Sequence, residues 1–243
     1  VVLGSPMQND RFRSSEEFIN LLIDNNIKIM MIPHEEEWIG MSEFNGKQLT
    51  EVDIAYLLPR DKIEVDMDAI GRLLRGKKIM ITGSAGSIGS EMVRQIAVYE
   101  PSELILIDQA ETPQHDIRLM MHFDWPEIKA HTIVASIANE ERMEKIFQTY
   151  RPDYVFHAAA YKHVPMMEDN SSESVLNNVN GTKIIADLSV KYGVKKFVMV
   201  STDKAVNPTN VMGCSKRICE IYTQALNAKL VKEYEANGSK GEV

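Results

Sequence analysis

The sequence predicts an α/β fold built on a doubly wound parallel sheet. From residue 71 onward, short apolar segments alternate with amphipathic helical segments, a pattern typical of consecutive β-α-β units. The first apolar segment, 78–82, runs directly into a turn with three regularly spaced glycines that opens a helix. Because such units connect their parallel strands through right-handed crossovers, we expect one sheet with helices on both faces.

Length and composition indicate a globular protein. The chain has 243 residues, of which 44% are hydrophobic, and this is enough for one large domain or for one domain and part of another. The net charge is −8 and no basic block occurs, which argues against nucleic acid as a ligand. No apolar run approaches the roughly 18 to 20 residues that span a bilayer, and we find no signal peptide. We therefore expect a soluble segment that makes no direct contact with a membrane.

The first 60 residues are expected to form a separate part of the chain. Residues 1–3 are typical of the end of a strand, 18–22 have a helical apolar stripe, and 27–32 are typical of a second strand. These segments make a β-α-β remnant that is too small to be a complete nucleotide-binding domain. The periodicity fades between residues 38 and 68, and we therefore place a domain boundary near residue 60.

The larger part, residues 61–243, is expected to form the sheet. Its five strands are expected at 78–82, 103–108, 130–135, 154–158 and 196–201. The helices that follow them are expected to begin near Ser87, Thr112, Asn139, Ser172 and Asn210. Ligands of such sheets bind beyond the carboxyl ends of the strands, so functional residues are expected where each strand ends. The chain has no initial Met and stops where another strand is expected, which indicates a fragment cut at both ends.

The glycine turn after the first strand predicts a site for a nucleotide phosphate. Gly83, Gly86 and Gly89 allow a tight turn, close approach of the backbone to a ligand and close packing of the following helix. A pyrophosphate would then lie at the N-terminus of that helix. The spacing differs by one residue from the usual dinucleotide fingerprint, so the motif alone is only moderately specific. The positions expected to contact a cofactor here are Gly83, Ser84, Gly86, Ser87, Ile88 and Gly89.

Asp108 closes the second strand, twenty-five residues after Gly83, near the interval at which a carboxylate binds the ribose hydroxyls of adenosine. A carboxylate at this point repels a 2′-phosphate, so NAD is favoured over NADP. The alternative is an ordinary aspartate that caps the turn between a strand and a helix. The upstream glycines make ribose binding the preferred interpretation.

Small side chains follow the fourth strand. Ala158, Ala159 and Ala160 would allow a flat cofactor to lie against the backbone. Lys162 comes shortly afterwards, at the carboxyl edge of the sheet, where it would either contact a phosphate or substrate or remain solvated. The sequence leaves these two roles of Lys162 open.

The histidines and cysteines predict no metal site. His157 and His163 have no ligand partner at a recognisable spacing, and we interpret them as structural residues. Cys214 and Cys219 fall in one expected helix, where their spacing does not favour a disulfide between them. Two structural thiols of this kind are typical of a protein from a reducing compartment.

The fifth strand ends in a cluster of groups that can transfer protons. Thr202, Asp203 and Lys204 offer a hydroxyl, a carboxylate and an amine at the edge where ligands bind. Met212 and Lys216 are four residues apart and share one face of the next helix. Each residue has a simpler explanation, as a turn cap, a solvated lysine or a core methionine. These explanations do not account for their joint placement.

Three motifs together resemble a known family. They are 82–89 (TGSAGSIG), 157–165 (HAAAYKHVP) and 201–208 (STDKAVNP), and they are similar to those of extended short-chain dehydrogenases/reductases. More closely, the chain resembles the nucleotide-sugar 4,6-dehydratases of bacterial capsular and surface polysaccharide synthesis, whose usual substrate is UDP-N-acetylglucosamine. The resemblance extends from about residue 61 to the end of the chain, and the third motif is its most specific part.

Residues 51–60 are similar to the connector of the long, membrane-anchored members of this family. Those members have transmembrane helices and a preceding Rossmann-like domain, so the resemblance implies that residues 1–60 are the end of such a domain. It also implies that the parent protein lies at the cytoplasmic face of the inner membrane and is a homo-oligomer at full length.

The resemblance assigns roles to individual residues. Those that would bind NAD are Gly83, Gly86, Gly89, Asp108 and Ala158. Lys216 matches the lysine that holds the nicotinamide ribose. Met212 stands where most of the superfamily has a tyrosine that exchanges a proton, although the long dehydratases share the methionine. Ser136 and Ile137 stand where relatives have Asp and Ile, so a hydroxyl replaces an expected carboxylate contact to adenine.

The resemblance further implies dehydration with tightly held NAD+ that is regenerated in each cycle. A hydride would leave C4 of the sugar and later return to C6. Lys204 would remove the C5 proton, Asp203 would protonate the departing C6 hydroxyl, and Thr202 would hydrogen-bond the C4 oxygen. Asp203 needs a raised pKa for this role, whereas the charge of Lys204 beside it would lower the pKa.

Two other functions remain open at this point. A UDP-sugar 4-epimerase would use the same fold and the same oxidation at C4 but return the hydride to C4. A non-catalytic module that binds NAD or a UDP-sugar is favoured by Met212, which cannot transfer a proton. In the resembled family, much of the sugar-nucleotide pocket comes from a C-terminal part beyond this chain. We therefore expect these residues to bind NAD but to dehydrate poorly by themselves.

Overall fold

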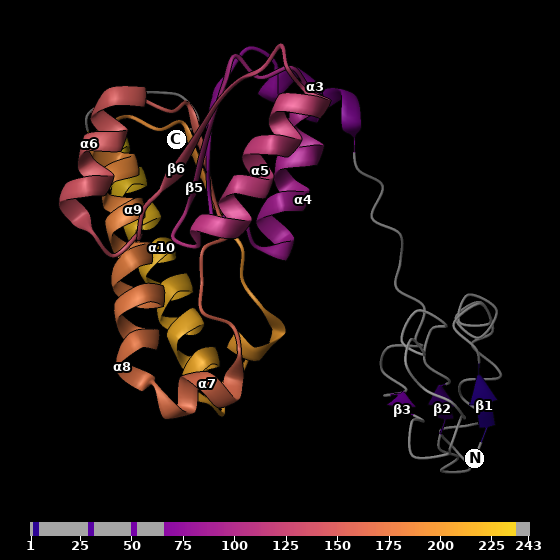
Figure 1. Ribbon diagram of the computed structural model, residues 1–243. Coiled ribbons are helices and arrows are strands. Elements are labelled where there is room, and N and C mark those ends of the chain that lie inside the picture. The colour runs from indigo at the N-terminus through magenta and orange to yellow at the C-terminus, as the bar shows by residue number, and fades with distance from the viewer. Residues whose placement is uncertain (1, 5–28, 32–49, 53–65, 237–243) are drawn as a thin grey trace. The chain divides into compact units, whose positions relative to one another are not determined.

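The computed structural model describes residues 2–4, 29–31, 50–52 and 66–236 (Figure 1). The chain divides into two compact units, 1–65 and 66–243, and each is described by itself. Of the first unit, three short strands are described. The second unit contains the larger sheet, its helices and the residues of the candidate site.

The first unit contains one small sheet. β1 (Val2–Gly4) pairs in parallel with β2 (Ile29–Met31), and β2 pairs antiparallel with β3 (Thr50–Val52). The parallel pair is the arrangement expected of a β-α-β unit. The sequence does not predict β3, which lies where the periodicity fades. The helical stripe expected at 18–22 lies outside the described residues.

The second unit is built on a five-stranded sheet with the order β6-β5-β4-β7-β8, in which every adjacent pair is parallel. The strands are β4 (Lys78–Thr82), β5 (Glu103–Asp108), β6 (Lys129–Val134), β7 (Tyr154–His157) and β8 (Lys196–Met199). The strand order runs outward from β4 in both directions. This confirms the predicted doubly wound α/β fold, and each predicted strand boundary lies within two residues of the observed one.

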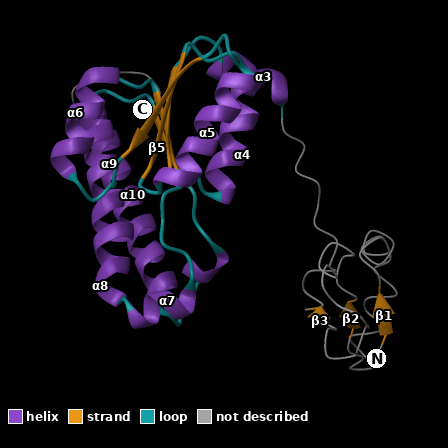
Figure 2. Ribbon diagram, viewed as in Figure 1, coloured by secondary structure: helices purple, strands orange, loops and turns teal. Residues whose placement is uncertain are grey.

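Helices cover both faces of this sheet. They are α3 (Met67–Leu74), α4 (Ser87–Ala97), α5 (Glu111–Asp124), α6 (Glu140–Tyr150), α9 (Gly181–Lys191) and α10 (Val211–Ala236). Figures 1 and 2 show α3, α4 and α5 on one face and α6, α9 and α10 on the other. The short helices α7 (Val164–Asp169) and α8 (Ser171–Ser174) lie beyond one end of the sheet. In the described part of the chain, no helix has both the length and the apolar character needed to cross a membrane.

The sheet is buried on both faces, which explains its nearly continuous apolar strands. In β4, Ile79 and Ile81 pack on one face in a core cluster that includes Val93 of α4. Met80 lies between them in the strand and packs in the opposite cluster with Phe147 of α6. All five side chains are completely buried.

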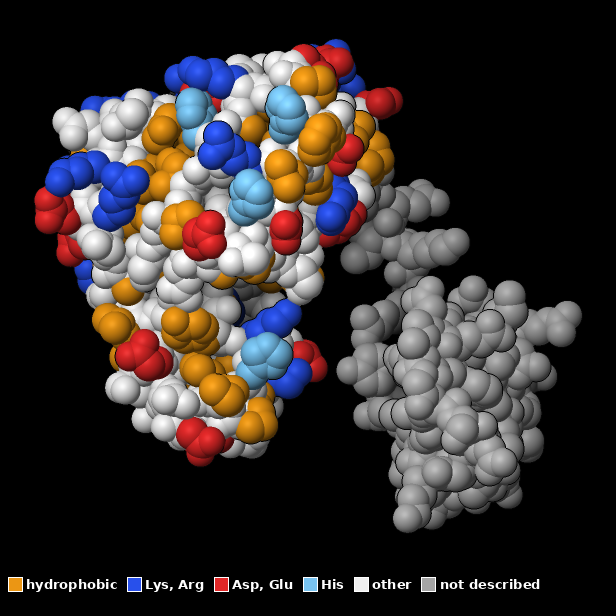
Figure 3. Space-filling view, viewed as in Figure 1, with side chains coloured by type: hydrophobic (Ala, Val, Ile, Leu, Met, Phe, Trp, Pro, Cys, Tyr) orange, Lys and Arg blue, Asp and Glu red, His pale blue; other side chains and the backbone are white. Residues whose placement is uncertain are grey.

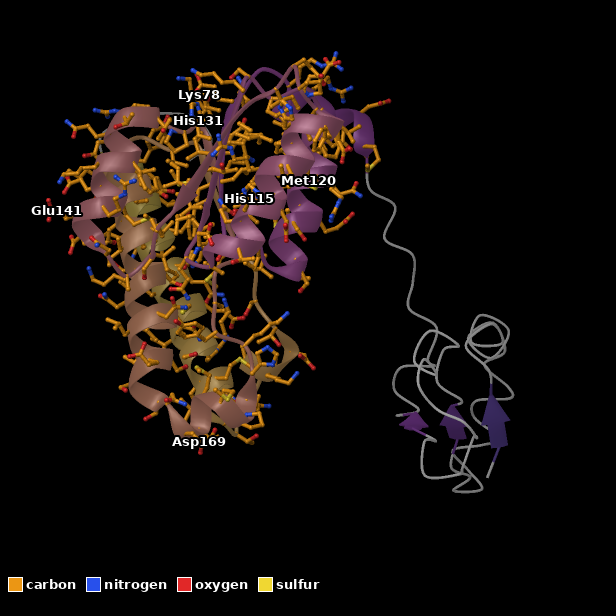
Figure 4. All side chains as sticks on the ribbon, viewed as in Figure 1. Lys78, His115, Met120, His131, Glu141 and Asp169 are labelled. Carbon is orange, nitrogen blue, oxygen red and sulfur yellow. The ribbon has the colours of Figure 1, made fainter. Side chains whose placement is uncertain are left out.

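The two ends of the sheet are distinguished by the direction of its strands. Figure 4 labels Lys78 and His131, near the beginnings of β4 and β6, at one end, and Asp169 of α7 beyond the other. The carboxyl ends of the strands therefore face α7 and α8. In a sheet of this topology, ligands bind at that end, where the strand order reverses between β4 and β7.

The segment between β7 and α9 differs from the prediction. The sequence predicts one helix that begins near Ser172, but the structure has α7, α8 and a π-helical segment, η5 (Val175–Asn180). The wider turn of a π-helix disrupts the 3.6-residue periodicity on which the prediction depends. The sequence does not predict α3 either, because its eight residues make little more than two helical turns, too few for a clear periodicity.

Replacement of Phe147 by Ala should destabilise the second unit. The ring is completely buried between α6 and the sheet, so its removal loses apolar burial and leaves a cavity. The expected loss in the free energy of unfolding is about 3 to 5 kcal/mol, measured by urea denaturation. Phe123→Ala is the matched control, since that ring is 72% exposed. Equal effects of the two substitutions would contradict the assigned core.

Candidate functional site

The turn between β4 and α4 brings three backbone segments together. Gly83 has a φ of +71°, in the left-handed region, and a Cβ placed there would lie 2.5 Å from the nitrogen of Ala159. A Cβ on Gly89 would lie 1.9 Å from the oxygen of Gly83. Only glycine fits at both positions. The glycine motif is therefore explained by close packing of the turn on the backbone after β7 and of α4 on the turn.

No side chain caps the N-terminus of α4. Gly86 is the N-cap residue and offers no hydroxyl or carboxylate. The first turn therefore leaves backbone N–H groups for an anion, and the aligned peptide dipoles add partial positive charge. Ser87, the first residue of the helix, accepts a 3.0 Å hydrogen bond from Nζ of Lys162. Lys162 thus adds positive charge where the sequence predicts a pyrophosphate.

A cavity of about 250 Å³ lies at the carboxyl ends of β4, β5 and β7. The predicted cofactor residues in its wall are Gly83, Gly86, Asp108, Ile137, Ala158, Ala159 and Ala160. Glycine and alanine supply most of this set, so a flat ligand can lie close to the backbone. The structure thus brings the glycine turn, the end of β5 and the alanines after β7 into one site.

Asp108 is held at this cavity by backbone amides. Its Oδ2 accepts a hydrogen bond from the Ala85 nitrogen at 3.0 Å, and its Oδ1 accepts one from the Ala110 nitrogen at 2.9 Å. Each carboxylate oxygen has two lone pairs, so both oxygens retain an acceptor for a ligand hydroxyl. Asp108 therefore caps the turn and still presents a carboxylate to the cavity.

The hydroxyls of two predicted cofactor residues, Ser84 and Ser136, form hydrogen bonds within the protein. Ser84 is completely buried and donates a 2.8 Å hydrogen bond to Oε1 of Gln114, a buried residue of α5. Ser136 accepts a 3.3 Å hydrogen bond from the Ala138 nitrogen. Neither residue forms part of the wall of the first cavity, so the cofactor contacts expected of Ser84 and Ser136 stay a prediction. Ser84 instead ties the glycine turn to α5.

A second cavity, of about 260 Å³, adjoins the first. Ala158, Ala160 and Tyr161 belong to both walls. The second wall also includes Ile88, Lys162, Thr202, Lys204, Met212 and Lys216. Figure 3 shows a hollow in this face of the molecule, with basic, histidine and acidic side chains beside it. The structure thus brings together four of the five residues that the sequence predicts for chemistry, and Asp203 is the exception.

Asp203 opens a short 3-10 helix, η6 (Asp203–Ala205), and points into solvent. Its carboxylate is 88% exposed and lies 3.8 Å from Nζ of Lys204. Oγ1 of Thr202 donates a 2.9 Å hydrogen bond to its Oδ1. This hydrogen bond and then the charge of Lys204 lower the pKa of Asp203. The direction is opposite to what a proton donor at neutral pH needs.

Met212 and Lys216 lie one turn apart on the buried face of α10. Only 3% of Met212 and 5% of Lys216 are exposed. Burial lowers the pKa of the Lys216 ammonium group. A Cβ on Gly213 would lie 2.3 Å from the oxygen of Lys204, so the absence of a side chain lets α10 pack directly on η6. The packing of α10 on η6 therefore places Met212 and Lys216 in the same cavity wall as Lys204.

Asn178 supports the walls of the site, and the sequence does not predict this role. Its Oδ1 accepts a hydrogen bond from the Tyr161 nitrogen at 2.8 Å, and its Nδ2 donates to the Tyr161 oxygen at 2.9 Å and to Oγ of Ser215 at 3.0 Å. The amide thereby fixes the loop after β7 relative to α10. Asn178 belongs to η5, and π-helical segments often accompany functional sites. The adjacent pair Asn177 and Asn178 within a helical stretch is a signal that could have identified it.

Comparison with known proteins identifies the family. A family model described as "Polysaccharide biosynthesis protein" matches residues 79–237, which include both cavities. The chain belongs to this family. One relative, the capsular polysaccharide biosynthesis protein CapD of Staphylococcus aureus, is 40% identical over 202 residues, which are 83% of this chain and 34% of CapD. Another, a UDP-N-acetylglucosamine 4,6-dehydratase (inverting) of Campylobacter jejuni, is 32% identical over 145 residues, which are 59% of this chain and 42% of that enzyme.

A solved structure supports the same relationship. The UDP-glucose 4-epimerase of Thermotoga maritima, determined with UDP-glucose, is 28% identical with a TM-score of 0.53, over 60% of this chain and 50% of the epimerase. This chain therefore spans between a third and a half of the lengths of the three proteins named. The resemblance to extended short-chain dehydrogenases/reductases that act on nucleotide sugars is confirmed.

The histidine at the end of β7 has a structural position in this member of the family. His157 is completely buried, with its Nδ1 2.6 Å from Oγ1 of Thr82 and its Nε2 2.9 Å from Oγ1 of Thr182. Burial, and then the charge of Lys216, lower the pKa of His157 to about 3. The neutral ring joins β4 to α9 next to the glycine turn, in agreement with the structural role expected.

The two cysteines of the chain are free thiols. Cys214 is exposed and Cys219 is buried. The Cys219 thiol donates to the Asn178 oxygen at 3.1 Å, so it helps to pack α10 against η5. Within the described ranges, no group of three His, Cys, Asp or Glu side chains is arranged to hold a metal ion.

The neutral state of His157 predicts a loss of stability in acid. Its pKa is about 3 in the folded protein and about 6.5 in an unfolded chain. Between these values the unfolded state binds more protons, so the free energy of unfolding falls as the pH decreases. This group contributes a slope of about 1.4 kcal/mol per pH unit, which urea denaturation at a series of pH values measures.

His157→Gln should reduce that slope, because glutamine does not titrate. The substitution also costs stability at every pH, so the slope rather than the absolute free energy is the test. His163→Gln is the matched control, since His163 is exposed, and it should retain the wild-type slope. An unchanged slope in His157→Gln would contradict the neutral, buried imidazole.

Proposed function

We propose that this chain is the cofactor-binding part of a UDP-N-acetylglucosamine 4,6-dehydratase that uses internally recycled NAD+ in polysaccharide biosynthesis. The observation that supports it most is the second cavity, where Thr202, Lys204, Met212 and Lys216 meet beside the glycine turn. Membership of the family and similarity to a UDP-N-acetylglucosamine 4,6-dehydratase add support. Because the chain spans only part of its relatives, the activity is proposed for the complete enzyme.

The residues around the first cavity fit NAD. Gly83 allows close approach to the backbone, and Asp108 retains two acceptors for ribose hydroxyls. Lys162 and the N-terminus of α4 would hold the pyrophosphate. When bound, NAD+ would supply an acceptor and later a donor of hydride. The carboxylate of Asp108 disfavours a 2′-phosphate, so we propose NAD rather than NADP.

Lys204 is the proposed base that removes the C5 proton. A ketone at C4 makes this proton acidic, and the half-exposed amine of Lys204 is available at the cavity wall. Thr202 would hydrogen-bond the C4 oxygen, and Lys216 would hold the nicotinamide ribose. Met212 cannot transfer a proton, so Thr202 and Lys216 would share the role that a tyrosine has in most of the superfamily.

Asp203 is the proposed acid for the C6 hydroxyl, and this role requires a change from the described state. Thr202 and Lys204 now lower the pKa of this exposed carboxylate. Burial beneath a substrate would raise the pKa of Asp203. If the Thr202 hydroxyl turned to the C4 oxygen of the sugar, the carboxylate would also lose the hydrogen bond that stabilises its charged form. Substrate binding would therefore supply both changes.

A UDP-sugar 4-epimerase is the second candidate function. The similar fold of the Thermotoga maritima UDP-glucose 4-epimerase favours it, and both reactions begin with oxidation at C4. An epimerase, however, neither removes the C5 proton nor protonates the C6 hydroxyl. Lys204 and Asp203 would therefore have no role in that reaction. A non-catalytic module is the third candidate, and Met212 is the residue that favours it.

The resemblance also supports proposals about the parent protein. Residues 1–60 would be the end of a preceding Rossmann-like domain, and the parallel pairing of β1 with β2 supports this assignment. The parent would be membrane-anchored at the cytoplasmic face of the inner membrane, would act as a homo-oligomer, and would bind a UDP-sugar substrate.

Isotopic labelling distinguishes the two reactions. UDP-N-acetylglucosamine with deuterium at C4 is incubated with the complete enzyme, and the product is examined by mass spectrometry and NMR. We expect a 4-keto-6-deoxy product that has lost water and has deuterium at C6. An epimer of unchanged mass with deuterium at C4 would contradict dehydration. Absence of any conversion by an enzyme that binds NAD would favour the non-catalytic module.

Lys204→Ala should lower turnover of the complete enzyme by about 10²- to 10⁴-fold, the usual effect of losing a positioned general base. Binding of NAD should be unchanged. Lys196→Ala is the matched control, because Lys196 is exposed at the start of β8 and lies outside both cavity walls. Product formation measured by chromatography gives the comparison. Undiminished turnover of Lys204→Ala would remove the role proposed for this lysine.

A further inference from the structure

Two neighbouring residues in the loop after β7 reach across the cofactor site. The phenol oxygen of Tyr161 accepts a 3.0 Å hydrogen bond from Nε2 of Gln109, which follows Asp108 at the end of β5. Lys162 donates its 3.0 Å hydrogen bond to Ser87, at the start of α4. Tyr161 and Lys162 thus contact the end of β5 and the start of α4, respectively.

Tyr161 stands between the two halves of the site. It belongs to the walls of both cavities, whose volumes are about 250 and 260 Å³. Each volume is below the roughly 300 Å³ at the lower end of small-molecule sites, so a dinucleotide needs both cavities. A ligand that occupies both cavities would contact Tyr161, and Gln109, at the other end of the hydrogen bond, lies in the wall of the first cavity.

The backbone of Tyr161 is fixed, whereas its side chain can open. Asn178 binds the backbone nitrogen and oxygen of Tyr161 at 2.8 and 2.9 Å. The hydrogen bond from Gln109 to the phenol oxygen is, by contrast, exposed to solvent. Such a bond has a small net free energy and breaks easily. The ring can therefore move about an anchored backbone.

We propose that the Gln109–Tyr161 hydrogen bond is a clasp that closes the cofactor site and slows the release of NAD. This inference rests on the proposed function, because a cofactor that is regenerated in each cycle has no need to leave. The clasp involves neither Lys204 nor Thr202. Loss of one exposed hydrogen bond is expected to raise the dissociation rate by about two- to tenfold.

Stopped-flow fluorescence measures the release of NADH when excess NAD+ displaces it. Tyr161→Phe removes the phenol oxygen but retains the ring, and Gln109→Leu removes the donor with little change in size. Each should raise the release rate about two- to tenfold. The double variant should be no faster than the faster single variant, because all three lose the same bond. Tyr99→Phe is the matched control, since that hydroxyl contacts Met67 outside both cavities, and it should release NADH at the wild-type rate.

Unchanged release from both single variants, or effects that multiply in the double variant, would overturn the clasp. If the wild-type protein binds NADH in that experiment, the result contradicts only the clasp and leaves the proposed NAD site supported. If the folded wild-type protein binds no NADH, the NAD assignment and the clasp are overturned together. Release of cofactor is measured rather than turnover, so the clasp is tested even if the enzyme is not a dehydratase.

Discussion

The close approach of Gly83 to the backbone of Ala159 is the contact on which the rest of the site depends. A Cβ at position 83 would lie 2.5 Å from the Ala159 nitrogen, so the turn after β4 and the chain after β7 can meet only without a side chain there. This approach forms one side of the first cavity and places Lys162, three residues after Ala159, within hydrogen-bonding distance of Ser87. A larger residue at position 83 would force the end of β4 away from the chain that follows β7. The residues after β7 that line both cavities would then lose their contact with the glycine turn.

Buried polar groups hold this contact in place from both sides of the first glycine. Thr82, before the glycine, is hydrogen-bonded to His157, which is hydrogen-bonded in turn to Thr182 of α9. Ser84, after the glycine, donates to Gln114 of α5. The turn is therefore tied to helices on opposite faces of the sheet. Buried polar groups that are paired in this way favour a single arrangement, because any shift leaves a donor or acceptor unsatisfied in a region of low dielectric.

Apolar runs predict the parallel sheet well because its strands are buried on both faces. The apolar run at 79–81 is followed closely by a glycine turn, and turn residues of this kind mark where a strand ends. The site is predicted only in part, because sequence spacing does not specify where a side chain points. Ser84 and Asp203 both stand in the expected motifs, yet one donates into the core and the other points into solvent. Asn178 is not predicted for another reason: it belongs to a π-helical segment, in which apolar residues do not recur with the 3.6-residue periodicity of an α-helix.

Local charge, rather than net charge, determines which ligand this site can take. The net charge of −8 disfavours an extended polyanion such as a nucleic acid. Among the described residues, however, the wall of the second cavity includes Lys162, Lys204 and Lys216 and no carboxylate. Burial lowers the pKa of Lys216, and an anion bound beside it would raise that pKa and be stabilised in return. The proposed NAD would place its pyrophosphate beside Lys162 and its nicotinamide ribose beside Lys216, at the wall that also includes Lys204. The positive charge of this wall is therefore consistent with the proposed NAD, and the net charge of the chain does not oppose its binding.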